Sequence, residues 1–379
     1  MFDFEKYKDI APYDEQNCIA AVGRILQHPE IIYALLQTLN PSTDEESVNY
    51  KKQVMGAILQ ELKTVKCYDD FQRHITAGYF IPYIMKYSAN KISFSQETPL
   101  AQDKAYLYIS NHRDIILDCA FLDYALLNEN LPICEMAIGD NLLANQLVED
   151  LFRLNGGVIV KRSLPLKEKY LESIRLSEYF VDKITEDNKS IWVAQKSGRS
   201  KDGIDTTHPA IIKMLYLSKR KSGISFSELI KNVNIVPVSI SYEFDPNDIN
   251  KARELVSMEH KGTYEKKRYE DVLSMSKGLR GYKGNIHVSL CEPLEGDYAT
   301  PDDVALEIDK RMHLAYKLWP SNYYAFDYLE HTDRFKAEYE NSDCKLFMRK
   351  YEHLSEEVRN MVLNSYANPV RSYLKACEN

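Results

Sequence analysis

The stretch from residue 106 to residue 118 reads Tyr-Leu-Tyr-Ile-Ser-Asn-His-Arg-Asp-Ile-Ile-Leu-Asp. An apolar strand pattern ends at Ser110 and Asn111, and an apolar helical pattern starts at Ile115. His112 therefore falls in the turn between a strand and a helix. Functional groups in α/β folds gather at the carboxyl ends of strands, so this turn is a candidate site.

Short apolar strands and amphipathic helices alternate on both sides of this stretch. The predicted strands are residues 105–109, 133–138, 157–160, 190–194, 235–241 and 285–290. The predicted helices between them are residues 115–127, 142–152, 166–184, 210–219 and 265–277. Two further helices are expected to begin at Ser225 and at Thr300, where capping residues occur. This alternation predicts an α/β fold in which helices flank a mixed, mostly parallel sheet.

The two ends of the chain differ from this central block. Residues 1–95 follow a helical pattern, and so do the charged, tyrosine-rich residues 321–379. We therefore expect a helical N-terminal region (1–95), an α/β domain (96–320) that carries the chemistry, and a helical C-terminal region (321–379).

The composition excludes some classes of protein. With 379 residues, 44% hydrophobic residues and a net charge of −8, the chain can bury a full core but is not the basic type that binds nucleic acid in general. Its seven cysteines form no Cys-x-x-Cys pair, which suits reduced thiols in the cytoplasm. We find no secretory signal and no apolar run of the roughly 20 residues that a spanning helix needs. We therefore expect a cytoplasmic protein that can sit peripherally at the inner face of the membrane.

A histidine followed closely by a carboxylate can act as a general base. Both Asp114 and Asp118 follow His112. The carboxylate accepts the Nδ1–H, fixes the tautomer and stabilises the imidazolium while Nε2 takes a proton. A lone histidine in such a turn more often caps a helix, but here Asn111 and Arg113 add to the cluster of polar groups. The cluster favours a functional site.

Asn-His-Arg at 111–113 followed by Leu-Asp at 117–118 resembles the first block of the glycerolipid acyltransferases, the superfamily of glycerol-3-phosphate and lysophosphatidate acyltransferases. The usual pattern of that family is His, four residues, Asp. Here five residues separate His112 from Asp118, whereas Asp114 follows after only one. Asp118 keeps the Leu-Asp-helix context and is the favoured partner, with Asp114 as the alternative.

Two later segments are similar to blocks of this family that carry basic residues. Residues 156–162 resemble the second block, a glycine-led apolar strand ending in Lys-Arg, and residues 198–201 (Gly-Arg-Ser-Lys) resemble the third. Arg and Lys at strand ends can hold a phosphate, Arg in a bidentate manner, and glycine permits close backbone approach. The candidate substrate-binding residues are Arg113, Lys161, Arg162, Gly198, Arg199 and Lys201.

The third block departs from the family pattern, and the fourth contains a proline within a strand. The family usually has a Glu, tied to acceptor binding, just before the third block; this chain has Lys196 and Ser197, with Gln195 as a partial substitute. Residues 235–243 (Ile-Val-Pro-Val-Ser-Ile-Ser-Tyr-Glu) resemble the fourth block, whose implied role is to shape the acyl pocket. Since Pro237 has no N–H, we expect an edge or bulged strand there.

The resemblance, which covers residues 105–243, implies an acyltransferase. It would move a fatty acyl group from acyl-CoA or acyl carrier protein to a hydroxyl of a glycerol phosphate or lysophospholipid-type acceptor, with His112 as general base. No cofactor and no metal is expected. The aromatic segment at 79–87 suits contact with a membrane surface, although docking onto the α/β core explains it equally well.

Two other functions remain open at this point. A non-catalytic lipid-binding relative is suggested by the unusual His–Asp spacing and the missing Glu. A hydrolase on a related α/β layout would use the histidine to activate water or a serine, but the chain has no Gly-x-Ser-x-Gly elbow.

Overall fold

A single seven-stranded sheet forms the centre of the computed structural model, which describes residues 2–378. The strand order is β1-β7-β6-β2-β5-β3-β4, and every neighbouring pair is parallel except β6 with β7. The strands are β1 (Lys91–Gln96), β2 (Leu107–Ser110), β3 (Glu135–Gly139), β4 (Gly157–Val160), β5 (Ile191–Ala194), β6 (Ile235–Tyr242) and β7 (Asn285–Leu290). The predicted mixed, mostly parallel sheet is confirmed, and β2 to β7 lie at the expected positions apart from their terminal residues.

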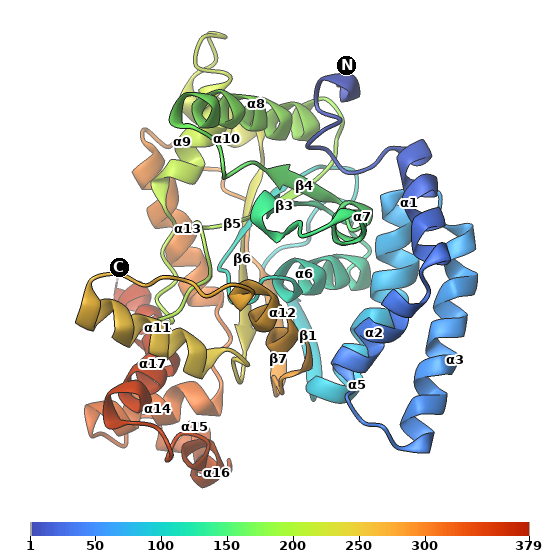
Figure 1. Cartoon of the computed structure of the whole chain (residues 1–379). Helices are drawn as coiled ribbons and strands as arrows, with labels where there is room; N and C mark the ends of the chain where they lie inside the picture. The colour runs from blue at the N-terminus through green and yellow to red at the C-terminus, as the bar shows by residue number, and fades with distance from the viewer. Residues whose placement is uncertain (1, 379) are drawn as a thin grey trace.

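Helices cover the sheet and extend beyond it at both ends of the chain (Figure 1). The N-terminal ones, blue in the figure and gathered along one side, are α1 (Glu15–Gln27), α2 (Glu30–Leu39), α3 (Glu45–Glu61), α4 (Tyr68–Asp70), the π-helix η3 (Phe71–Phe80) and α5 (Ile81–Ser88). The central ones are α6 (Leu117–Asn128), α7 (Gln146–Leu154), α8 (Leu166–Thr185), α9 (Pro209–Leu217), α10 (Phe226–Asn232), α11 (Asp248–Lys261), α12 (Glu270–Arg280) and α13 (Pro301–Ala315). The C-terminal ones, red in the figure, are α14 (Pro320–Glu330), α15 (Lys336–Tyr339), α16 (Cys344–Arg349) and α17 (Glu356–Glu378). Short 3₁₀ turns occur at η1 (Phe4–Lys6), η2 (Leu62–Thr64) and η4 (Asp140–Leu142).

Strand β2 is buried on both faces, so its side chains alternate between two cores. Tyr108 packs in a core built with the N-terminal helices, α6 and α7. Leu107 and Ile109 pack in a second core with α8, α9, α10 and α13. A strand buried on both faces appears in sequence as a continuous apolar run, which is the pattern at residues 105–109. The turn that carries His112 is therefore attached to a strand held from both sides.

Two strand predictions are wrong. Strand β1, at Lys91–Gln96, falls at the end of the segment predicted to be helical, and it pairs in parallel with β7 at the edge of the sheet. Its alternation of polar and apolar residues, Lys-Ile-Ser-Phe-Ser-Gln, is the period-2 signal of a half-buried strand. Strand β6 is neither an edge nor a bulged strand, since it lies between β2 and β7 in continuous register and all its residues are buried.

The position of Pro237 within β6 explains why a central strand tolerates proline. The N–H of Cys291 donates to the carbonyl of Pro237 (3.0 Å), just beyond the last residue of β7. The missing N–H of the proline therefore falls where the ladder between β6 and β7 ends, and few sheet hydrogen bonds are lost.

The C-terminal helices form a third core beside the sheet. Phe347, Tyr351 and Tyr366 pack there against residues of α11 and α14. In addition, Nδ2 of Asn368 in α17 donates to the carbonyl of Asp202 (2.7 Å), so this region supports the loop that follows β5.

The aromatic segment at 79–87 spans the end of η3 and most of α5. Ile81, Tyr83 and Ile84 are buried in the core that the N-terminal helices share with the sheet. This burial favours docking onto the α/β core over membrane contact for these side chains.

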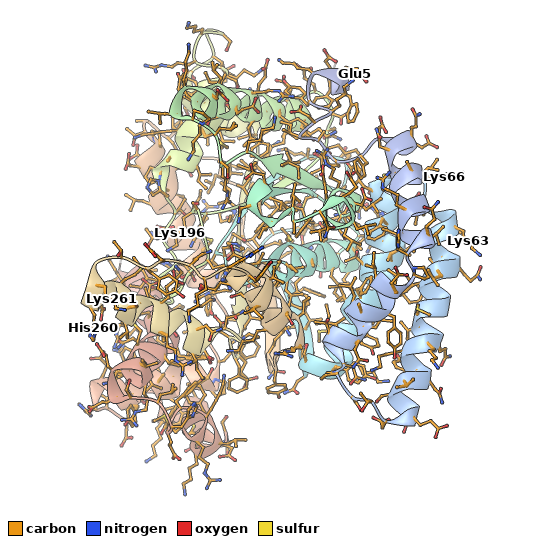
Figure 2. All side chains as sticks on the ribbon, in the orientation of Figure 1. Glu5, Lys63, Lys66, Lys196, His260 and Lys261 are labelled. Carbon is orange, nitrogen blue, oxygen red and sulfur yellow. The ribbon has the colours of Figure 1, made fainter. Side chains whose placement is uncertain are left out.

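Charged side chains lie on the surface at several of the helices. In Figure 2 side chains fill the space between the helices and the sheet, and the labelled Lys63, Lys66 and Lys261 lie at the periphery. No helix within residues 2–378 combines the length and the apolar character needed to cross a bilayer.

Candidate active site

The ring of His112 lies beside α6, in the turn that follows β2. Its Nδ1 is 2.8 Å from Oδ2 of Asp118, a residue in the first turn of that helix. The side chain is 14% exposed and packs edge to face against Trp192, with ring centroids 5.9 Å apart. Because Nδ1 is engaged, Nε2 is the nitrogen that can take a proton from a bound molecule. The pair has the geometry of a base and the group that orients it.

The five-residue interval is accommodated because the turn curls around the Asp118 carboxylate. Besides the His112 ring, Oδ2 accepts hydrogen bonds from the N–H groups of Arg113 (2.6 Å) and Asp114 (3.0 Å). The other oxygen, Oδ1, accepts one from the hydroxyl of Tyr242 at the end of β6 (2.8 Å). The carboxylate is thus held by four donors in a buried position, with its orientation fixed.

Asp114 has a different environment. Its Oδ1 accepts the N–H groups of Ile116 and Leu117, both at 3.0 Å, so it caps the start of α6. Burial, together with a second carboxylate nearby, raises the pKa of Asp114. Gly278 of α12 approaches so closely that a Cβ there would lie 2.0 Å from Oδ2 of Asp114. A glycine at this point lets α12 pack against the turn.

A cavity of about 480 Å³ opens beside His112. Helix α6 contributes its lining from Leu117 to Tyr124, and α2, η3, α5, α7 and α12 contribute about half of the rest. The lining is largely apolar; among the larger side chains are Leu39, Phe71, Phe80, Ile84, Leu151, Phe152 and Leu279. The N-terminal helices therefore build part of the site, a role that the sequence did not predict.

Three of the predicted basic residues line this cavity: Arg162, Arg199 and Lys201. Lys201 forms an ion pair with Glu254, which also lines the cavity. The guanidinium groups of Arg162 and Arg199 have no ion-pair partner within residues 2–378, and Nη1 of Arg199 is buried without a hydrogen bond. Unpaired guanidinium groups beside a cavity are suited to bind an anionic group of a ligand.

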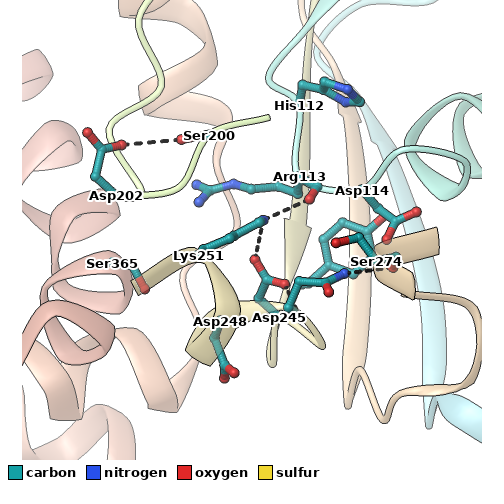
Figure 3. Close-up of polar contacts among 12 residues, drawn as sticks. His112, Arg113, Asp114, Ser200, Asp202, Asp245, Asp248, Lys251, Ser274 and Ser365 are labelled. Atoms are coloured by element: carbon teal, nitrogen blue, oxygen red, sulfur yellow. Dashed lines mark hydrogen bonds and ion pairs between the residues drawn. The ribbon is translucent and has the colours of Figure 1, made fainter. Parts of the chain in front are cut away.

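The other two predicted basic residues do not reach the cavity. Nζ of Lys161 pairs with Asp9 at 2.6 Å. Arg113 is buried, and its Nη2 pairs with Asp205 at 2.6 Å. The side chains of His112 and Arg113 point away from each other (Figure 3), so consecutive residues serve different regions.

The loop that carries Arg199 is attached directly to the His112 turn. The N–H of Ser200 donates to the carbonyl of His112 (2.7 Å), and Nδ2 of Asn111 donates to Asp205 farther along the loop (3.1 Å). Gly198, which lines the cavity, has a φ of +81° that favours glycine over any other residue. The base and the arginine loop thus keep a fixed spatial relation.

The cavity lining also includes a buried carboxyl group with a raised pKa. Asp123, on α6, accepts hydrogen bonds from Nε2 of Gln72 (2.6 Å) and the N–H of Cys134 (3.0 Å). Burial raises its pKa to about 7. Asp123 lies six positions after Leu117, which is roughly 9 Å along a helix axis.

Sequence reasoning missed several residues of the site. Lys196, Lys266, Glu254 and Asp271 also line the cavity. Lys196 was visible as the replacement of the family's Glu, whereas the other three lie in α11, α12 and the loop between them, where nothing in the spacing marks a site. Gln195, the suggested substitute, is buried outside the cavity lining. Residues 235–243 do not line the cavity either.

The fold and the site together define an α/β protein with a histidine–aspartate pair at a strand end, beside an apolar cavity with cationic side chains. No cluster of three or more acidic, histidine or cysteine side chains arranged to hold a metal ion occurs among the described residues.

Comparisons with known proteins point to a family. Residues 91–241 match the family model described as Acyltransferase. No curated protein matches the chain. Among solved structures, one similar chain is the 1-acyl-sn-glycerophosphate (LPA) acyltransferase PlsC from Thermotoga maritima, at 12% identity and a TM-score of 0.37, with 78% of this chain and 92% of that chain covered. An overlap this loose does not by itself relate the two chains.

The match therefore assigns an acyltransferase domain to residues 91–241. The matched residues run from β1 almost to the end of β6, and they include His112, Asp118, Arg162 and Arg199. The N-terminal helices and α12, which build much of the cavity, lie outside them.

Proposed function

We propose that the protein is an O-acyltransferase that moves a fatty acyl group from an acyl thioester to a hydroxyl of a glycerol phosphate or lysophospholipid acceptor. His112 is the general base, and Asp118 orients it. The observation that carries the proposal is the hydrogen-bonded pair of these two side chains beside a cavity that is apolar over most of its lining and cationic elsewhere.

In the proposed reaction the acceptor attacks the thioester directly. Nε2 of His112 takes the proton of the acceptor hydroxyl while the oxygen attacks the carbonyl carbon. The C–S bond then breaks, and the proton passes from the imidazolium to the departing thiolate. The carboxylate of Asp118 stabilises the imidazolium between these steps. General-base catalysis of this kind contributes about 10²- to 10⁴-fold.

The apolar lining supports a fatty acyl chain as the group that is transferred. Buried apolar surface contributes roughly 25 cal/mol per Å², so a chain enclosed between α6 and the N-terminal helices is held without any polar contact. The donor is an acyl-CoA or an acylated carrier protein.

The unpaired arginines support a phosphorylated acceptor. Arg162 and Arg199 line the cavity without a carboxylate partner among the described residues, so a phosphate can bind them without displacing an ion pair. Lys201 already forms an ion pair with Glu254, so it contributes less to acceptor binding. Lys161 and Arg113 take no direct part, because carboxylates away from the cavity already engage them.

We also propose that the protein works in the cytoplasm, peripherally at the inner face of the membrane, in phospholipid biosynthesis. Val272 and Leu273, on the helix that lines one side of the cavity, are 48% and 67% exposed, which suits contact with lipid. Co-sedimentation with phospholipid vesicles tests this placement, and recovery of all the protein in the supernatant would contradict it.

Lipid mass spectrometry tests the proposed activity. Pure protein is incubated with acyl-CoA or acylated carrier protein and, in separate reactions, with glycerol-3-phosphate, lysophosphatidate, lysophosphatidylcholine and an unphosphorylated monoacylglycerol. We expect an acylated product with a phosphorylated acceptor and much less with the monoacylglycerol.

The same reactions separate the alternatives. Thioester loss at an equal rate without acceptor would identify a hydrolase. Saturable thioester or lysolipid binding without any turnover would identify a non-catalytic lipid-binding protein.

A further inference from the structure

Tyr242 makes the one side-chain hydrogen bond to Asp118, other than that of His112, within residues 2–378. Its hydroxyl donates to Oδ1 at 2.8 Å, whereas the His112 ring contacts Oδ2. The two side chains therefore hold the carboxylate from opposite oxygens. The Asp118 side chain is only 1% exposed, so no bulk water competes for either oxygen.

The environment of Tyr242 keeps its hydroxyl a proton donor. The residue is 6% exposed, and burial followed by the nearby carboxylate of Asp118 raises the pKa of the phenol well above its usual value. Its backbone is held at the end of the central strand β6, paired with Ile286 of β7, and its ring packs against Phe121 of α6 (6.1 Å between centroids). The donor and the acceptor thus come from two rigid elements.

Tyr242 does not line the large cavity beside His112. It borders instead a small polar void of about 20 Å³ together with Arg113, Asp245 and Tyr316. A substrate in the large cavity would consequently not touch it, and any effect of its hydroxyl on the reaction must pass through Asp118.

We propose that Tyr242 is a positioning residue that fixes the Asp118 carboxylate and sets the proton affinity of His112. Only the effect of Tyr242 on catalysis rests on the proposed function; its effect on His112 does not. A hydrogen bond donated to Oδ1 withdraws negative charge from the carboxylate, so that the carboxylate stabilises the imidazolium less. Removal of the hydroxyl should therefore strengthen the interaction of the Asp118 carboxylate with the imidazolium.

Three variants separate this role from a merely structural one. Tyr242→Phe removes the hydroxyl and keeps the ring. Replacement of Tyr242 by 3,5-difluorotyrosine keeps the hydroxyl and makes it a stronger donor, so the fold is retained even if the phenylalanine variant is unstable. The matched control is Tyr108→Phe, because Tyr108 is also buried, in the neighbouring strand β2, and its hydroxyl has no hydrogen-bond partner among the described residues.

If the proposed acyl transfer takes place, steady-state kinetics give a first reading. Tyr242→Phe should lower kcat about tenfold, a part of the general-base contribution, and leave KM within about twofold. The acidic limb of its kcat/KM profile should move to higher pH. A rise in KM at unchanged kcat would instead place the tyrosine in substrate binding and contradict the proposal.

The decisive experiment does not depend on turnover. Diethyl pyrocarbonate reacts with neutral imidazole, so the pH dependence of labelling at His112, read by peptide mass spectrometry, follows the protonation of this ring in the full chain. Relative to wild type, we expect the midpoint to rise by about half a pH unit in Tyr242→Phe, a roughly threefold change in proton affinity, to fall in the difluorotyrosine protein, and to stay unchanged in Tyr108→Phe. Equal midpoints in wild type and both Tyr242 variants would overturn the inference. Shifted midpoints in a protein that transfers no acyl group would uphold it and reject the proposed function alone.

Discussion

His112 and Arg113 are neighbours in one turn, yet they face two regions that differ in whether the cationic side chains have ion-pair partners. On the His112 side lies the cavity, whose arginines have no ion-pair partner within residues 2–378. On the Arg113 side the buried cations are neutralised in place. Arg113 pairs with Asp205, and Lys251 bonds both Asp245 (2.5 Å) and the carbonyl of Arg113 (2.8 Å; Figure 3).

The difference shows how one turn serves both structure and chemistry. A buried charge without a partner is costly, so the paired cations on the Arg113 side hold the turn in shape. Arginines that remain unpaired beside a cavity keep their binding capacity for a ligand. The same residue type thus has a structural role on one side of the turn and a proposed ligand-binding role on the other.

The largest effect is expected at the carboxylate that orients His112. Asp118→Asn keeps the size of the side chain but favours the wrong tautomer of the ring, so kcat should fall by about 10²- to 10⁴-fold. Asp327→Asn, a buried aspartate in the C-terminal region, serves as the matched control and should keep the wild-type rate. A loss below about fivefold for Asp118→Asn would remove it from the mechanism.

The second prediction compares one arginine from each region. Arg199→Ala should lower kcat/KM for a phosphorylated acceptor by about 10- to 100-fold, the value of a lost charged hydrogen bond, with little change in thermal stability. Arg113→Ala should do the reverse and lower the free energy of unfolding by about 3–5 kcal/mol, because Asp205 is left buried without its cation. Denaturant unfolding and acceptor kinetics of both variants measure this crossed pattern, and equal effects on both quantities would contradict it.

A third prediction uses two carboxyl groups with opposite pKa shifts, the buried Asp123 and the partly buried Asp245. Burial raises the pKa of Asp123 to about 7, whereas at Asp245 the effect of burial is outweighed by Lys251, which lowers the pKa. The folded protein holds a proton on Asp123 that the unfolded chain releases, so this group costs stability as the pH rises from about 4 to 7.

Asp123→Asn should therefore gain stability relative to wild type between pH 5 and pH 8, by on the order of 2 kcal/mol. Asp245→Asn should lose stability at neutral pH, with a smaller loss as the pH falls below about 4. Urea unfolding across this range provides the measurement, and a stability difference for Asp123→Asn that is independent of pH would show that its carboxyl is not held protonated.

The smallest effect is expected at the cap of α6. Asp114→Ala removes the acceptor of the Ile116 and Leu117 N–H groups and should cost about 1 kcal/mol of stability, with a modest loss of rate. Asp114→Asn keeps a cap oxygen and should recover most of that stability. A larger rate loss for Asp114→Ala than for Asp118→Asn would reverse the assignment of the orienting carboxylate.

The features predicted from sequence are those with local causes. The apolar run before Asn111 marks a strand buried on both faces, and the Leu-Asp-helix context singled out Asp118, the carboxylate that lies at His112. Features that depend on distant pairs were not predictable. Lys161 forms an ion pair with Asp9, which lies near the start of the sequence, and Arg113 forms one with Asp205 in another loop.

The cavity could not be predicted from the sequence for a related reason. Apolar residues of η3 and α5 that line a cavity have the same helical spacing as residues that fill a core, so periodicity alone does not separate the two. The place of Pro237 in a central strand could not be predicted either, because it depends on where the antiparallel partner strand ends.

The most direct test of the central claim is the acyl-transfer rate of His112→Ala, measured by product mass spectrometry with the best acceptor of the wild type. His287→Ala, which removes a half-buried histidine of β7 outside the cavity, is the matched control. We predict a loss of at least about 10²-fold for His112→Ala at an unchanged melting temperature, with the control at the wild-type rate. Wild-type turnover by the His112→Ala protein would contradict the account.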